Sequence, residues 1–113
     1  MLFLSSLYHL GITFEDVRLE RTRLEIFHDG EWGTVRDHNW DLNDASVVCT
    51  MLGLGDAVDA ITNGAEFPGT DGPVWIENID CNGGERTLLD CVYKRALDDN
   101  DHNSDVGVRC SEG

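Results

Sequence analysis

The feature that most constrains this chain is its set of four cysteines, Cys49, Cys81, Cys91 and Cys110. An even number of cysteines in a short, glycine-rich chain is typical of small extracellular domains stabilised by disulfides. We therefore expect two disulfides and an oxidising compartment, with free thiols as the alternative. Four cysteines allow three pairings, and the residues alone leave all three open.

A short amphipathic helix that contains the first cysteine is predicted near the middle of the chain. Its apolar residues recur at i, i+3, i+4 and i+7, which is one face of a helix: Ala45, Val48, Cys49 and Leu52. Asp41 or Asn43 can accept the first free backbone N–H groups. Gly53 can end the helix in the left-handed conformation. A cysteine on the buried face of this helix can tie it to a distant strand.

Short strands are predicted on both sides of this helix, over residues 16–19, 24–27, 31–36, 74–79 and 105–110, with a further strand and loop within 56–67. Asp29 and Gly30 form a strong hairpin-turn signal between the second and third strands. Residues 86–91 are expected to form one or two helical turns with Leu88 and Leu89 facing inward. Residues 94–104 are predicted to be an irregular, strongly acidic loop.

The charge balance narrows the classes of partner. The chain has 22 acidic and 8 basic residues, for a formal net charge of −14. Binding to nucleic acid is disfavoured because phosphates require clusters of basic side chains. A basic protein partner, cation binding or simple solubility all fit this charge.

The first fifteen residues differ from the rest. Residues 1–15 are interpreted as a lead-in or a degenerate signal-like segment, and residues 16–113 as the folded domain. No basic residue precedes Arg18, and polar residues interrupt the apolar run, so the segment is a poor secretory signal. It is also too short to span a bilayer. A membrane anchor would have to lie outside this chain.

Six blocks of sequence resemble the scavenger receptor cysteine-rich (SRCR) domain of the six-cysteine type: HDGEWGTV, NWDLNDASVVC, MLGLGDA, GPVWIENIDC, GGERTLLDC and DVGVRC. The blocks follow the order of the family and cover most of residues 17–110. The resemblance implies a compact, disulfide-stabilised α+β fold in which a curved antiparallel β-sheet cradles one main helix. It also implies an extracellular, scavenger-receptor-like module for recognising ligands, and no enzyme.

The resemblance selects one disulfide pairing, Cys49 with Cys110 and Cys81 with Cys91. It also shows that a third family disulfide is missing, because Arg36 and Asn100 occupy its two positions. Loss of the whole pair leaves no odd thiol, which supports the alignment. The resemblance therefore implies a domain less stable than its relatives, unless packing around Arg36 compensates.

Family members often bind calcium, and the resemblance implies that the calcium sites are degenerate in this chain. Of the first site only Asp37 remains, because His38 and Ser104 stand where the family has acidic residues. The positions of the second site hold Glu77 and Asp99. Asp37, Glu77 and Asp99 could still meet, assisted by Asp98 or Asp101.

Calcium requires six to eight oxygen ligands, mostly from carboxylates. We therefore expect no cofactor, and a solvated acidic loop without an ordered ion. A sharper hypothesis is that Arg36 or His38 supplies the positive charge that calcium supplies in relatives.

Enzyme activity is not predicted. The four histidines are scattered and no nucleophile motif is present. The cysteines also lack the close spacing of a zinc site. The sequence therefore predicts a secreted protein or the ectodomain of a membrane protein that recognises a protein ligand with a basic surface. The alternative is a structural spacer in a multidomain extracellular protein or secreted protease.

Overall fold

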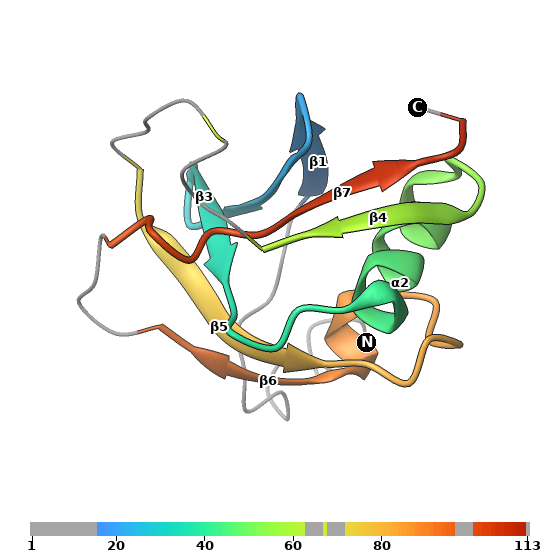
Figure 1. Cartoon of the computed structure of the whole chain (residues 1–113). Coiled ribbons are helices and arrows are strands. Elements are labelled where there is room, and N and C mark those ends of the chain that lie inside the picture. Colours follow the sequence, from blue (N-terminus) through green and yellow to red (C-terminus); the bar gives the residue numbers. More distant parts are fainter. Residues whose placement is uncertain (1–15, 63–66, 68–71, 97–100, 113) are drawn as a thin grey trace, which may run out of the picture.

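The computed structural model describes residues 16–62, 67, 72–96 and 101–112. These residues form seven strands, one α-helix and one 3-10 turn (Figure 1). In chain order the elements are β1 (Asp16–Glu20), β2 (Arg23–His28), β3 (Glu31–Arg36), α2 (Leu42–Leu52), β4 (Ala57–Ile61), β5 (Val74–Asp80), η2 (Leu88–Asp90), β6 (Val92–Arg95) and β7 (Gly107–Cys110).

The strands of the described residues pair into one sheet in the order β4-β7-β2-β3-β5-β6, with β1 paired to β2. Neighbouring strands are antiparallel except β3 and β5, which run parallel. A parallel pair needs a long crossover connection, and here the chain between β3 and β5 contains both α2 and β4. The α+β fold predicted from the sequence is confirmed, with this one pairing making the sheet mixed.

The helix α2 forms because both of its ends are capped. The Asp41 side chain accepts the Asp44 N–H, and the Asp44 side chain accepts the Asp41 N–H, which makes a capping box. Gly53 closes the helix with φ of 68°, the left-handed conformation that glycine adopts without a Cβ penalty. The predicted helix is confirmed, and Asp41 rather than Asn43 is its N-cap.

The core lies where α2 packs against β4, β7 and η2 (Figure 1). The largest fully buried apolar side chains come from the helix, from the strands and from the segments next to them: Leu24, Ile26, Val35, Val47, Val48, Ile76, Leu88, Val106 and Val108. Trp40, just before the helix, donates its indole N–H to the Gly107 carbonyl at 2.9 Å. This bond joins the start of the helix to the last strand.

Two disulfides fasten this arrangement. Cys49 of α2 is bonded to Cys110 at the end of β7, with a Cα–Cα distance of 5.8 Å. Cys81 and Cys91 close a smaller loop, with a Cα–Cα distance of 4.8 Å. These are the two pairs that the resemblance implies, and no free cysteine remains.

Two glycines of the family blocks are required by close approaches. A Cβ atom on Gly33 would clash with the Trp75 ring, and one on Gly107 would clash with the backbone carbonyl of Thr22. Glycine at these positions therefore lets the Trp75 ring rest on β3, and lets β7 approach the β1–β2 turn.

The prediction of an irregular loop over residues 94–104 is wrong at its start. Lys94 and Arg95 belong to β6, which pairs antiparallel with β5 at the end of the sheet. The strand was hidden because it has only four residues and no buried alternation, with Val92 75% exposed. Edge strands are often short and charged in this way.

Candidate functional site

Arg36 lies at the end of β3, at the position of the missing family disulfide. Its guanidinium Nε donates to Glu77 Oε1 of β5 at 2.9 Å, and its Nη2 contacts the same oxygen. The two residues are register partners in the parallel pair. Both side chains are partly exposed, so the pair contributes up to about 1 kcal/mol. That is well below the roughly 4 kcal/mol of a long-loop disulfide.

A small polar cavity of about 250 Å³ surrounds this ion pair. Its lining residues include several that the sequence singled out: Arg36, His38, Glu77, Asn78, Asp101 and Ser104. The bulge of β5 near Asn78, which has φ of 56°, shapes one wall.

Asp37 does not line this cavity, because its side chain turns into the protein and is only 2% exposed. Its Oδ1 accepts the Asn39 N–H at 2.8 Å, while its Oδ2 has no hydrogen-bond donor. Burial raises the pKa of Asp37, partly offset by the backbone N–H groups near it and by His38. Asp37 is therefore absent from the cavity lining that contains Glu77, and Asp98, Asp99 and Asn100 lie outside the described residues.

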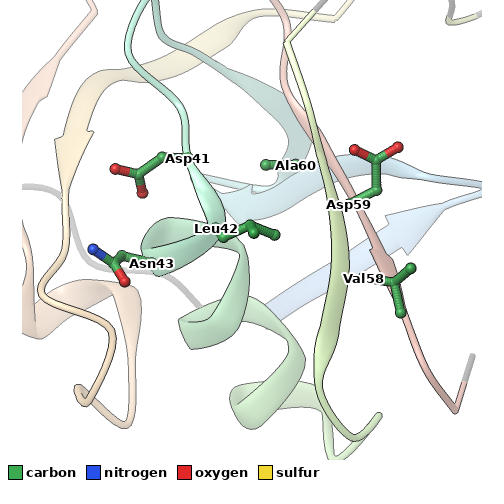
Figure 2. Close-up of a pocket in the computed structure, with 6 residues that line it drawn as sticks. All are labelled: Asp41, Leu42, Asn43, Val58, Asp59 and Ala60. Atoms are coloured by element: carbon green, nitrogen blue, oxygen red, sulfur yellow. The ribbon is translucent and has the colours of Figure 1, made fainter.

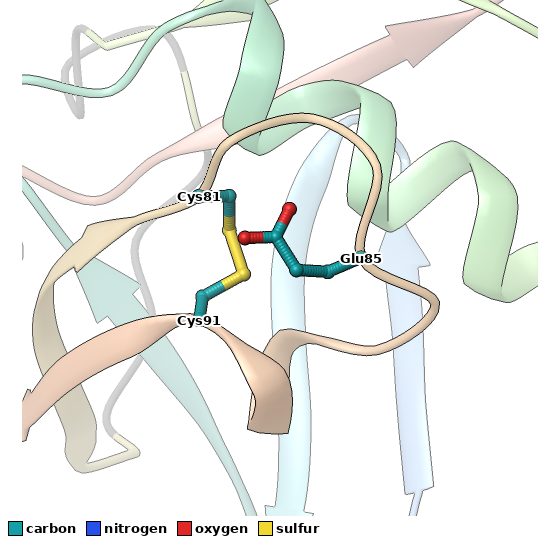
Figure 3. A group of neighbouring side chains, drawn as sticks. All are labelled: Cys81, Glu85 and Cys91. Atoms are coloured by element: carbon teal, nitrogen blue, oxygen red, sulfur yellow. A yellow bond between two sulfur atoms is a disulfide. The ribbon is translucent and has the colours of Figure 1, made fainter.

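Among the residues that the structure describes, one group of three potential metal ligands lies close together, and it is formed by Cys81, Glu85 and Cys91 (Figure 3). Both sulfur atoms are used in a disulfide. The Glu85 carboxylate accepts the N–H groups of Asn82 and Gly83 at 2.8 to 3.1 Å, which lowers its pKa. The group therefore orders a loop and does not fit a metal ion.

The described residues do not fit the calcium site that the family implies. Calcium would need several free carboxylates, but the Glu77 carboxylate already binds the Arg36 guanidinium. Asp37 has one buried carboxylate oxygen without a hydrogen-bond donor, but its side chain is not among those that line the cavity around Glu77. A guanidinium next to the expected ligands disfavours a divalent cation through charge repulsion.

A second polar cluster, which the sequence did not predict, joins β3 to the segment before β7. The Thr34 hydroxyl donates to Asp105 Oδ1 at 2.8 Å, and His102 Nδ1 lies 2.9 Å from Asp105 Oδ2. His102 Nε2 lies 2.8 Å from the Gly72 carbonyl. Because Asp105 and Gly72 engage both imidazole nitrogens, neither is left to activate a nucleophile, and the cluster links three segments. His102 and Asp105 lie three positions apart, which is a local signal for their contact, but no sequence signal marks the contacts with Thr34 and Gly72.

The sequence also did not predict that Asp44 makes a long-range contact. Besides capping α2, its Oδ1 accepts the Cys81 N–H at 2.8 Å, so one carboxylate holds both the helix start and the second disulfide loop. Desolvation by burial raises the pKa of Asp44 to about 7, although the two backbone donors favour the ionised form. Burial also raises the pKa of Asp105.

We predict that the domain becomes less stable as pH rises from about 4 to about 7. In this range an unfolded Asp44 has lost its proton while the folded one keeps it, so unfolding releases protons and raising the pH favours it. The expected loss of unfolding free energy is on the order of 2 kcal/mol. Urea unfolding at about pH 5 and about pH 7.5 measures the difference. Asp44→Asn should reduce it, and equal stability at both pH values would contradict the prediction.

A mixed sheet packed on one helix, with that helix bonded to the last strand, is the architecture of an SRCR domain. This chain belongs to that family, because the family model described as "Scavenger receptor cysteine-rich domain" matches residues 18–111. The chain is 46% identical over 89 residues to "Lysyl oxidase homolog 2" of Gallus gallus and 43% identical to that of Homo sapiens. These matches cover 79% of this chain but 11% of each relative.

Two solved structures share the fold. The dimeric form of the SRCR domain of mouse MARCO aligns with a TM-score of 0.69 and 34% identity, covering 96% of this chain and 98% of that one. The third SRCR domain of murine neurotrypsin aligns with a TM-score of 0.71 and 36% identity, covering 87% and 96%. Within the described residues, no helix is long and apolar enough to cross a membrane.

Proposed function

We propose that this chain is an extracellular ligand-recognition module that binds a protein partner through basic groups of the partner and does not use calcium. SRCR domains are protein-interaction modules, and both disulfides fit an oxidising compartment. The observation that carries the preference for a basic partner is that half of the basic side chains are already paired with carboxylates of the chain itself. Of the 8 basic residues, Arg18, Arg23, Arg36 and Arg109 already form ion pairs with carboxylates.

Capture of polyanions is accordingly not proposed. A polyanion needs a cluster of free cations or a bound metal ion, and the 22 acidic residues of this chain would repel it. The Arg36–Glu77 pair supports the hypothesis that a guanidinium takes the electrostatic role of calcium here.

A structural spacer is the second candidate function. It is favoured by the small share of the relatives that the chain covers, 11% of lysyl oxidase homolog 2, which suggests one module among others. In such a protein we place any catalytic machinery outside these residues and assign this chain no enzymatic activity.

Binding to charged beads tests the proposal. The 113-residue chain is passed over polylysine-coated and dextran-sulfate-coated beads, each with calcium and with a chelator. We expect retention on polylysine that is equal with and without calcium, and no retention on dextran sulfate. Calcium-dependent retention on dextran sulfate would refute the proposal. Retention on neither bead would leave the spacer function as the better account.

A further inference from the structure

One shallow groove is lined by two of the three large apolar side chains that are exposed among the described residues. It has a volume of about 520 Å³ and runs between the start of α2 and β4 (Figure 2). Leu42 and Val58, which line it, are 52% and 60% exposed. The described residues have one other large apolar side chain with such exposure, Val92 on β6.

The groove combines these apolar side chains with acidic ones. Asp41, at the N-cap of the helix, and Asp59, on β4, complete the lining together with Asn43 and Ala60. Both carboxylates are exposed, and Asp59 uses its Oδ2 for an ion pair with Arg109 at 2.9 Å. Figure 2 shows these side chains on the helix start and along the strand.

The groove adjoins the end strand of the described sheet. β4 is the end strand of the sheet and pairs only with β7 among the described strands. An open strand edge beside apolar side chains is a common docking place for a peptide segment of another protein.

We propose that this groove is the docking site for a partner segment in which an apolar side chain is flanked by lysines or arginines. The inference rests on the proposed function and locates it. Leu42 and Val58 bury the apolar side chain, while Asp41 and Asp59 attract the flanking cations. Charge selects this occupant, because an acidic segment would meet both carboxylates.

Two labelled hexapeptides test this, one with two central leucines between pairs of lysines and one with serines in place of the leucines. Fluorescence anisotropy measures their affinities for the 113-residue chain. We expect the leucine peptide to bind about tenfold more tightly, from burial of its apolar side chains. L42S together with V58S should remove that advantage. V92S, at the third exposed apolar side chain, is the matched control and should leave it intact.

Thermal unfolding of each variant verifies that it is folded, since all three positions are exposed. Equal binding of both peptides to the wild-type chain would contradict the proposal that the groove is a docking site, but it would not contradict the preference for basic partners. The same conclusion would follow if V92S removed the advantage and the groove variant did not. If neither lysine peptide bound, both the proposed preference for a basic partner and the proposed docking site would be contradicted.

Discussion

Replacing Cys49 and Cys110 together with alanine is expected to lower the free energy of unfolding by about 4 kcal/mol. The disulfide joins residues 61 positions apart, and a cross-link across so long a loop removes much of the freedom of the unfolded chain. Small domains have only about 5–15 kcal/mol in total, and this chain already lacks one family disulfide. We therefore expect the double variant to be largely unfolded near physiological temperature.

The matched comparison is the pair Cys81 and Cys91, separated by 10 positions. Removing it should cost about 3 kcal/mol in the same model. Urea unfolding of both double variants measures the two losses. The account would be contradicted if the short-loop variant were much less stable than the long-loop variant.

Replacing Glu25 with alanine is expected to destabilise the domain by about 3–5 kcal/mol. The Glu25 carboxylate is buried and accepts from two guanidinium groups: Arg18 Nη2 lies 2.7 Å from Oε1, and Arg23 Nη2 lies 2.9 Å from Oε2. Removing it deprives the buried Arg23 guanidinium of the Glu25 carboxylate that it binds, and the loss of this favourable charge pairing is the main cost.

Asp59→Ala provides the control for this prediction. The Asp59–Arg109 pair has the same 2.9 Å separation, but both side chains are more than half exposed, so its loss should cost less than about 1 kcal/mol. Chemical unfolding measures both variants. Similar losses for Glu25→Ala and Asp59→Ala would show that burial does not set the strength of these pairs.

The elements with local signals were predictable from the sequence. The capping residues Asp41 and Gly53 and the apolar face around Cys49 define α2 within the chain itself, and the Asp29–Gly30 turn fixes the β2–β3 hairpin. The strand β6 was not predictable in this way. Its residues show no buried face, and its existence depends on pairing with β5.

The polar clusters could not be predicted because their members are brought together by the sheet. Glu25 alternates with the core residues Leu24 and Ile26, so its sequence position suggests a solvent-facing side chain. Its burial arises from Arg18 and Arg23 on the second face of the sheet. The link from Thr34 to Asp105 spans 71 positions, a distance at which no periodicity gives a signal.

The candidate calcium site shows that a family resemblance can predict the positions of ligands without predicting the contacts that their side chains make. The resemblance placed Asp37 and Glu77 among the inherited ligand positions, but it did not predict which groups their side chains bind. Asp37 is buried next to Asn39, while Glu77 is engaged by Arg36. Such orientations depend on the strand register between β3 and β5, which the sequence does not encode locally.

Digestion of the unreduced chain followed by mass spectrometry of the linked peptides tests the whole account most directly. We predict one linked pair containing Cys49 and Cys110 and another containing Cys81 and Cys91, as the folded domain places them. Finding Cys49 joined to Cys81 or Cys91 would contradict the fold, and with it the assignment of every surface and cluster described above.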